Sequence, residues 1–419
     1  MAALPVQALL VQHEAHLLCA ARHVVVIERK RHGHAFSSTV TSSGTISRPD
    51  FAPLRAWYKP GRRLLAPLSA RCSPVTLAVV RGRTFGARCR VGVRDMPNVP
   101  LTFACGLYDR MLALYTGEVP VEGADLKFIV EDNPRHIFDR MAASQAYDAA
   151  EFSSSEYISR YVANECPFVA IPVFASRVFR HGFIFVNRKH VKSPKDLQGK
   201  RIGVPVYTMT AAIFIRGLLS DEFGIDFSQC EWVEGDINSA KPHGNPTILP
   251  TAKKLSVGAN KSGKSLSTLL EEGELHAIVG TGVPSAFGRN PDVVRLYPDY
   301  RAAEMDYYRR TKIFPIMHTV VIRKDVHERH PFVAQSLYRA CDRAKDIALE
   351  KMRYRGTLRH TLPWMLAELD EIDAVFGGDP WPYGVEPNRP TLEALVRYLA
   401  EQGVIAKAPK VDDLFVPVR

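Results

Sequence analysis

From Met96 to the C-terminus, short apolar runs alternate with segments of helical periodicity. Each apolar run is long enough for one strand and too short for a buried helix. This alternation is typical of an α/β fold whose strands are mostly parallel. The expected strands are Leu101–Ala104, Lys127–Val130, Val169–Phe174, Phe183–Val186, Arg201–Val204, Ala277–Gly280 and Thr319–Ile322.

Two helices are marked by apolar stripes. The first is expected at Pro331–Met352, with proline in its first turn and an inward stripe of Phe332, Leu337, Cys341, Ala344, Ile347 and Ala348. The second is expected at Thr391–Gln402, with Gly403 as its stop and Leu392, Leu395, Val396 and Leu399 facing inward. Residues Gly235–Gly263 are dense in Gly, Pro, Asn, Ser and Lys, which predicts a long surface loop.

The first 95 residues differ in composition from the rest. They hold fifteen Lys and Arg against four acids, out of 55 and 44 in the whole chain, so residues 96–419 carry 40 of each sign. A basic, Ser-rich and acid-poor segment with little periodicity beyond Val24–Ile27 predicts a disordered extension. A transit segment and a reading frame extended upstream of Met96 remain alternatives. A nucleic-acid arm is the weaker reading, because the folded part has no excess charge.

Composition also bounds the class of protein. The chain of 419 residues exceeds one typical core of about 150 residues, which favours several folding units or one two-lobed domain. No eighteen-residue apolar stretch exists, so we expect no membrane partner. Seven cysteines without a C-x-x-C pattern favour a reducing compartment. We expect a cytoplasmic protein, or a mitochondrial one if residues 1–95 are a transit segment.

One phosphate-loop pattern occurs, G-x-x-x-x-G-K-S at Gly258–Ser265. Its chemistry requires a buried strand before it and a long helix after it. Here Lys253–Val257 is a poor core strand, and the helical segment reaches Glu271-Glu272-Gly273 within two turns. The pattern therefore favours a solvated turn capped onto a short helix.

Three segments carry candidate ligand groups. In the first, Ser153 and Glu156 have the spacing of a capping box, and Glu151, Ser154 and Ser155 add polar groups beside it. In the second, Arg177, Arg180 and His181 follow an apolar run, where guanidinium groups can hold a carboxylate and a histidine can exchange a proton. The third follows the expected strand Arg201–Val204 and contains Tyr207, Thr208 and Thr210, at the kind of strand end where open α/β sheets bind ligands.

Neither His318 by itself nor the spacing of the histidines identifies a functional site. A single histidine on an apolar run, as in Pro315–His318, is more often a core residue than a functional one. The folded part contains no H-x-H or H-E-x-x-H pattern, and the run His327–His330 is too charged for a metal site. We therefore expect no metal centre from local spacing.

These segments belong to a longer match. Residues from about Leu101 to Phe415 resemble the 4,5-dihydroxyphthalate decarboxylase family, which is built on the two-lobed fold of type II periplasmic binding proteins. The stretches that carry the resemblance are colinear and cover about three quarters of the chain. They are Gly106–Asp109, Phe168–Phe174, Arg177 with Phe179–His181, Asp196–Pro205, Met209–Ala212, Tyr307–Thr311, Ile313–His318 and Trp381–Asn388. The chain departs from the family pattern at Arg110, where the family tends to have His. Because arginine is always charged, we expect an extra cation at the mouth of the cleft.

The resemblance implies a hinge and a central cleft between two lobes. Residues 96–181 and 318–419 would form lobe one and residues 182–317 lobe two, with crossovers near His181–Gly182 and Pro315–His318. Arg177, Arg180, His181 and His318 would then lie at the hinge and face the segments that begin at Ser153 and Thr208.

The resemblance also implies non-oxidative decarboxylation of a hydroxylated aromatic acid. His181 or His318 would protonate the ring carbon, Arg177 and Arg180 would hold carboxylate, and Glu151 or Tyr207 would bond a hydroxyl. Ser153, Ser154, Thr208, Thr210 and Tyr108 complete the expected substrate site. A ring hydroxyl can supply the electrons, so no cofactor is required.

Three questions stay open on the sequence. A divalent metal held by His181, His318, Glu151 and Asp109 is an alternative to cofactor-free catalysis. A non-catalytic binding protein for a small acidic aromatic ligand would share the fold. The sequence does not decide the oligomeric state.

Overall fold

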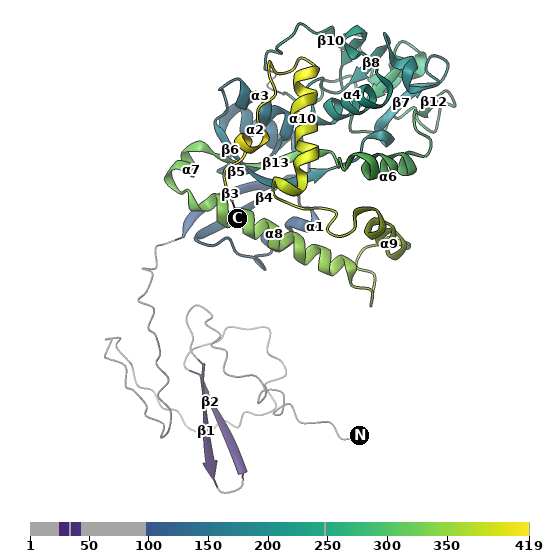
Figure 1. Ribbon diagram of the computed structural model, residues 1–419. Helices are drawn as coiled ribbons and strands as arrows, with labels where there is room; N and C mark the ends of the chain where they lie inside the picture. The colour runs from purple at the N-terminus through teal and green to yellow at the C-terminus, as the bar shows by residue number, and fades with distance from the viewer. Residues whose placement is uncertain (1–24, 33–34, 43–97, 247–248, 419) are drawn as a thin grey trace. The chain divides into compact units, whose positions relative to one another are not determined.

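The computed structural model describes residues 25–32, 35–42, 98–246 and 249–418 (Figure 1). The chain divides into two compact units, Met1–Cys89 and Arg90–Arg419. In the first unit, β1 (Val25–His32) pairs antiparallel with β2 (Ala35–Ser42), starting from the register Val25 opposite Ser42. The rest of the predicted N-terminal extension lies outside the described residues.

The second unit contains two mixed sheets. The five-stranded sheet has the order β4-β3-β5-β13-β6, and the six-stranded sheet has the order β10-β9-β8-β11-β7-β12. The first is built from β3 (Val99–Cys105), β4 (Ala124–Val130), β5 (Ala149–Ser153), β6 (Phe168–Arg177) and β13 (Ile316–Arg323). The second is built from β7 (Ile184–Asn187), β8 (Arg201–Val204), β9 (Glu231–Glu234), β10 (Val257–Ala259), β11 (Ala277–Val279) and β12 (Val293–Arg295).

The two sheets share one topology. In each sheet one strand is received across a crossover from the other half of the unit; it is β13 in the first sheet and β7 in the second, and we call it n. When the remaining strands are numbered 1 to 4 in chain order, both sheets have the order 2-1-3-n-4. Strand β10 is an extra strand at the edge of the second sheet. In each sheet the received strand, β13 or β7, runs antiparallel to both of its neighbours, and the other pairings are parallel. The expectation of mostly parallel sheets was therefore only partly right, because a strand that returns across a crossover enters from the opposite end. This is the two-lobed α/β fold of type II periplasmic binding proteins.

Helices connect and cover the strands (Figure 1). Among the described residues the α-helices are α1 (Asp109–Tyr115), α2 (Pro134–Ser144), α3 (Ser154–Val162), α4 (Thr210–Phe223), α5 (Leu266–Glu272), α6 (Tyr300–Thr311), α7 (Lys324–Arg329), α8 (Phe332–Arg353), α9 (Met365–Phe376) and α10 (Arg389–Glu401). Helix α8 packs against α1 and β6, and α10 packs against α4. Because α10 contacts a helix from residues 182–317, the assignment of all of 318–419 to lobe one stays a prediction. Among the described residues, no helix is both long and apolar enough to cross a membrane.

The expected helices α8 and α10 are confirmed to within two residues. Their inward leucines, Leu337, Leu392, Leu395 and Leu399, are buried. Phe332 is the exception: it is 43% exposed, whereas the next residue, Val333, is fully buried, so the buried face of α8 begins at Val333. After α10, Gly403 adopts a φ of +69°, which ends the helix as expected.

Strands β1 and β2 lie in the segment that was expected to be disordered, and four strands of the second unit were not expected from the sequence either. Strand β5 contains Glu151 and was read as part of a capping segment; β9, β10 and β12 are short, and charged or glycine residues interrupt their apolar pattern. Such strands are specified by their pairing partners more than by their own composition. Apart from β10, the described part of the expected loop Gly235–Gly263 contains no regular element.

The phosphate-loop pattern forms a capped turn. Strand β10 includes its first two residues, Gly258 and Ala259, and the helix that follows, α5, has only seven residues. Ser265 caps α5 by accepting a hydrogen bond from the Thr268 amide, and Lys264 Nζ contacts Glu272 at 2.6 Å and Glu274 at 3.1 Å. The lysine that would meet a phosphate in a nucleotide site is therefore paired with carboxylates.

We expect this turn to bind no nucleotide. Titration of the protein with magnesium-ATP should give the same heats as titration of Lys264→Ala, because the lysine is held by acidic neighbours and the helix is too short for a phosphate cradle. Magnesium-dependent binding in the wild-type protein that is lost in Lys264→Ala would contradict this expectation.

Candidate active site

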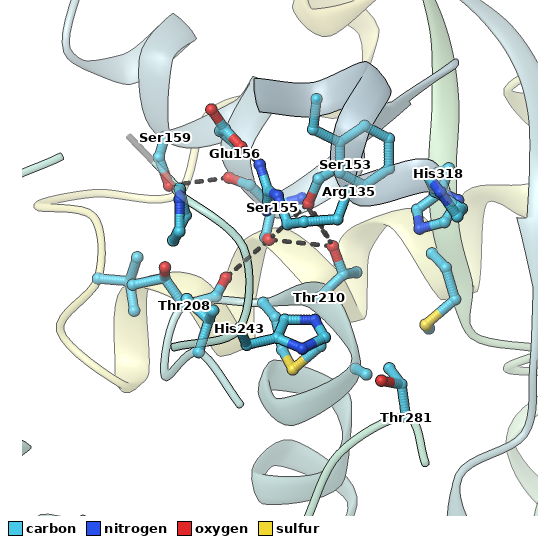
Figure 2. Close-up of a pocket in the computed structure, with 18 of the residues that line it drawn as sticks. Arg135, Ser153, Ser155, Glu156, Ser159, Thr208, Thr210, His243, Thr281 and His318 are labelled. Carbon is cyan, nitrogen blue, oxygen red and sulfur yellow. Dashed lines mark hydrogen bonds and ion pairs between the residues drawn. The ribbon is translucent and has the colours of Figure 1, made fainter. Parts of the chain in front are cut away.

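A cavity of about 350 Å3 lies where segments of the two sheets face one another. Its walls come from the N-terminal ends of α2, α3 and α4, from the segment after β6, from β13 and from the loop after β9. Five of the expected residues line it: Ser153, Arg180, Thr208, Thr210 and His318. All of these except Arg180 are labelled in Figure 2.

The most informative pair in this cavity is Glu151 and His318. On the antiparallel strands β5 and β13, His318 lies opposite Ser153 and Val320 lies opposite Glu151, so Glu151 and His318 are diagonal neighbours. The Nδ1 atom of His318 is 2.5 Å from Oε1 of Glu151. Phe138 packs edge-on against the imidazole at 4.8 Å between ring centroids. The histidine is thus fixed through Nδ1, while its ring lines the cavity.

Glu151 is completely buried below His318. It accepts hydrogen bonds from the Tyr108 hydroxyl at 2.9 Å, the Gly106 amide at 3.2 Å and the Cys105 thiol at 3.4 Å. Burial alone would raise the pKa of Glu151, but His318 and the hydrogen-bond donors outweigh it, so the pKa lies below its ordinary value. A buried carboxylate held in this way fixes the orientation of the imidazole.

Arg180 is a buried cation in the cavity wall. Its side chain is 5% exposed, its Nε atom contacts Met317 Sδ at 3.2 Å, and its guanidinium lies over the Phe183 ring. No carboxylate among the described residues lies within 4.0 Å of it. Burial lowers the pKa of Arg180 to about 10, so it stays charged at neutral pH. A buried guanidinium without an ion pair is suited to an anionic ligand.

Arg135, which sequence reasoning missed, is a second cation in the wall. It stands in the first turn of α2, where Asn133 accepts a hydrogen bond from its amide. Its Nε atom bonds Asp139 at 2.7 Å, and its Nη2 atom lies 3.6 Å from Glu156. That Nη2 atom is buried and has no hydrogen-bond partner in the described structure. Arg135 Nη2 therefore forms an ion pair with Glu156 without a hydrogen bond, and the guanidinium adds positive charge to this wall.

Hydroxyl groups join the N-termini of α3 and α4. Thr210 Oγ1 accepts a hydrogen bond from the Ser155 amide at 3.1 Å and lies 3.2 Å from Ser153 Oγ, and Ser155 Oγ donates to the Thr208 carbonyl at 2.8 Å (Figure 2). The expected capping box is wrong: Ser153 makes no side-chain cap, and a threonine from the other helix caps α3 instead. Glu156 is turned toward Arg160 and Arg135.

The loop after β9 brings His243 into the cavity, a residue that sequence reasoning missed. Its Nδ1 atom is 3.5 Å from Asp236 Oδ2. The neighbouring Gly244 has a φ of +72°, and a Cβ there would lie 2.5 Å from Arg135 Cγ, so only glycine allows this approach. A histidine in a Gly- and Lys-rich loop has no periodic pattern that could have marked it.

Four expected substrate residues do not line this cavity. Arg177 is buried elsewhere and donates to the Pro382 carbonyl and the Asn388 side chain. The ring of Tyr207 packs against Arg216, whose Cζ atom is 3.8 Å from the ring centroid. Ser154 is buried in α3, and Tyr108 reaches Glu151 from behind. Arg177 and Tyr207 thus serve packing in the described structure, whereas Tyr108 supports the Glu151–His318 pair.

His181 also lies outside this cavity. Its ring is 1% exposed, packs edge-on against Tyr297 and Tyr307, and has its Nδ1 atom 4.0 Å from Glu304 Oε1. Burial lowers the pKa of His181 to about 4, with Arg310 acting in the same direction. Burial also disfavours the charged form of Glu304, and because this form is the deprotonated one, the pKa of Glu304 is raised to about 7. Between about pH 4 and 7 both groups are therefore mainly neutral.

This pair predicts opposite pH dependences of stability in two variants. Neutral His181 stabilises the fold above about pH 6.5, and this contribution is lost as the pH falls toward 4. Neutral Glu304 stabilises the fold below about pH 4.5, and this contribution is lost as the pH rises through 7. Between pH 4.5 and 6.5 the two slopes oppose each other in the wild-type protein. We expect Glu304→Gln to gain stability with rising pH in this window and His181→Asn to lose it, by up to about 1.4 kcal/mol per pH unit.

Urea unfolding of the wild-type protein and both variants across this window measures the slopes. Parallel pH profiles in Glu304→Gln and His181→Asn would contradict the predicted pairing.

The metal alternative finds no supporting cluster. Within the described ranges, no group of three or more His, Cys, Asp and Glu side chains is arranged to hold a metal ion. Of the four proposed ligands, only Glu151 and His318 meet; Asp109 lines a separate cavity of about 380 Å3, and His181 lies beside Glu304.

Arg110 is not at the mouth of the cavity, contrary to expectation. It is held between the rings of Tyr108 and Trp381, at 4.2 and 4.3 Å, and donates to the Ala175 carbonyl. A side chain stacked between two rings and bonded to β6 has a packing role here.

Known proteins resemble the chain in sequence and fold. A family model described as NMT1/THI5 like matches residues 121–246. The 4,5-dihydroxyphthalate decarboxylase of Comamonas testosteroni is 35% identical over 329 residues, covering 77% of this chain and 98% of that protein. The enzyme of the same name from Pseudomonas putida is 37% identical over 216 residues, covering 51% of this chain and 83% of its own.

Solved structures resemble the fold more distantly. One is the periplasmic aliphatic sulphonate binding protein SsuA of Escherichia coli, with a TM-score of 0.44 and 11% identity over 76% of this chain and 97% of that one. The sequence match to the Comamonas testosteroni protein spans nearly all of that relative at 35% identity. The chain therefore belongs to the 4,5-dihydroxyphthalate decarboxylase family, a family of carboxy-lyases.

Proposed function

We propose that this protein decarboxylates a hydroxylated aromatic acid of the 4,5-dihydroxyphthalate type by protonating the ring carbon that carries the leaving carboxylate. The observation that carries the proposal is the Glu151–His318 pair in the wall of a cavity that also contains the buried Arg180. The names of the two curated relatives support the substrate class.

The arginines account for binding of an aromatic dicarboxylate. Arg180 can bond one carboxylate through its planar fork, and the positive charge of Arg135 in the same wall favours a second acidic group. Ser153, Thr208 and Thr210 supply hydroxyl groups at the same wall. Two cations in a cavity of this size therefore favour a ring that bears two acidic groups over one that bears a single group.

His318 is the proton donor in this proposal. With Nδ1 held by Glu151, its Nε2 atom can transfer a proton to the ring carbon. The C–C bond to the carboxylate then breaks, its electron pair restores the aromatic ring, and carbon dioxide leaves. His318 recovers one proton from solvent in each turnover. A ring hydroxyl supplies the electron density for protonation, so we propose that no organic cofactor is needed.

Glu151 and Tyr108 position the donor. The buried carboxylate selects the ring orientation of His318 and offsets the imidazolium charge, and Tyr108 holds the carboxylate from the other side. Glu151 is completely buried, so its contacts with His318 and Tyr108 are stronger than the same contacts in solvent.

The proposal is tested by product analysis in deuterium oxide. Incubation with 4,5-dihydroxyphthalate, phthalate and 4-hydroxybenzoate, with and without a chelator, should release carbon dioxide fastest from the first acid. The product should carry one deuterium at the carbon that lost its carboxylate.

Two results would contradict the proposal. Calorimetric binding of the same acids without any carbon dioxide release would show a binding protein. Loss of activity with the chelator that is restored by a divalent ion would show that a metal takes part in the reaction.

A further inference from the structure

Decarboxylation of a hydroxylated ring involves two proton movements. One proton goes to the ring carbon, and removal of another from the hydroxyl raises the electron density at that carbon. The Glu151–His318 pair can supply the first. A base for the second is needed elsewhere in the cavity, at a distance set by the width of the ring.

The titratable side chains that line the cavity are Arg135, Glu156, Arg180, His243 and His318. The two arginines are cations and cannot accept a proton. Glu156 is bound by Arg160 at 3.0 Å and lies 3.6 Å from Arg135, so its carboxylate is already occupied. His318 faces Glu151 and serves as the acid. His243 is the remaining group.

The surroundings of His243 repeat the carboxylate–imidazole arrangement. Its Nδ1 atom is 3.5 Å from Asp236 Oδ2, and Asp236 Oδ1 accepts hydrogen bonds from the amides of Asn238 and Ser239 at 3.0 and 2.8 Å. With Nδ1 directed to the aspartate, Nε2 of His243 is the nitrogen left to accept a proton.

The loop that carries His243 is fixed to α2. The Asn245 amide donates to Asp139 Oδ2 at 3.1 Å, and Gly244 packs against the Arg135 side chain. Asp139 also binds Arg135, so one carboxylate ties the loop and a cavity arginine together. Figure 2 shows the rings of His243 and His318 apart from each other; His243 comes from the loop after β9 and His318 from β13.

We infer that His243 is the catalytic base that takes the proton from the ring hydroxyl, with Asp236 as its positioning residue. This inference rests on the proposed decarboxylation. The hydroxyl O–H bond breaks and its proton moves to His243 Nε2; the phenolate electrons move through the ring as His318 protonates the ring carbon. When carbon dioxide leaves, the phenolate takes its proton back from His243.

The inference assigns substrate specificity as well. A ring hydroxyl conjugated with the leaving carboxylate is required, because only such a hydroxyl transmits the electron pair to the carbon that His318 protonates. Acids without that hydroxyl should bind to the arginines and remain unreacted.

The test compares His243→Asn with the matched control His190→Asn, which changes an exposed histidine outside the cavity. We expect His243→Asn to lower kcat with 4,5-dihydroxyphthalate by about 100-fold, with KM within about threefold of wild type, and His190→Asn to leave both unchanged. A ring-fluorinated substrate, assayed at a pH where its hydroxyl is already ionised, should reduce the loss in His243→Asn to below about tenfold.

Several outcomes overturn the inference. They are a normal kcat in His243→Asn, a raised KM with unchanged kcat, and an equal loss with both substrates. If His243→Asn has the wild-type kcat while His318→Asn is inactive, this inference is overturned and the proposed decarboxylation is still supported. A wild-type protein inactive on all the acids would overturn both.

Discussion

Replacing His318 by asparagine is expected to lower kcat by about 10³-fold while KM stays within about threefold. Asparagine preserves a polar group near Glu151 but cannot deliver a proton to carbon. Because proton transfer occurs only in the transition state, the loss should appear in kcat and not in binding. Steady-state release of carbon dioxide from 4,5-dihydroxyphthalate measures both constants.

The control for this experiment is His181→Asn, which removes a buried histidine that lies outside the cavity. It should retain kcat within about threefold at neutral pH. Should His181→Asn lose activity and His318→Asn keep it, the donor would be His181 and the proposed site would be wrong. Circular dichroism of both variants separates a chemical defect from a folding defect.

Replacing Arg180 by methionine is expected to lower kcat/KM by about 10³-fold, mainly through KM. Removing one partner of a buried charge pair with a ligand costs about 2–5 kcal/mol, which corresponds to this range. Arg180→Lys keeps the charge but loses the planar fork, so its defect should be smaller and still in KM. A variant whose KM is unchanged would show that Arg180 does not hold the substrate.

The same variant predicts an opposite effect on stability. Burial lowers the pKa of Arg180 to about 10, and the charge of Glu304 acts in the opposite direction. No carboxylate of the described residues lies within 4.0 Å of Arg180, so the folded chain carries the cost of a desolvated cation. Arg180→Met should therefore raise the free energy of unfolding of the ligand-free protein by about 1–3 kcal/mol. Urea unfolding measures this, and a large loss of stability would indicate a structural role instead.

Family membership and fold class followed from the sequence, because both depend on local and colinear patterns. The apolar runs that became β3, β6, β8 and β13 are readable without knowledge of their partners, since alternation and length alone mark a buried strand. Helices α8 and α10 are readable for the same reason. The quoted stretches around Arg180 and His318 also placed two groups of the cavity on the list of candidates.

Which candidates meet was decided by tertiary structure. Glu151 and His318 are 167 positions apart, and they become neighbours only because β13 returns beside β5 in one particular register. Arg177 and Arg180 are three residues apart, yet the end of β6 directs one to the Pro382 carbonyl and the other to the cavity. Sequence spacing could not separate these two, because side-chain direction changes where a strand ends.

The sequence by itself therefore determined the α/β class, the principal strands and helices, and the family. Only the tertiary structure decided that His181 is buried away from the cavity while His318 lines it, and that His243 enters from a loop without periodicity. The physical reason is that local patterns encode which face of an element is buried, whereas a site is made by the order and register in which distant elements pack.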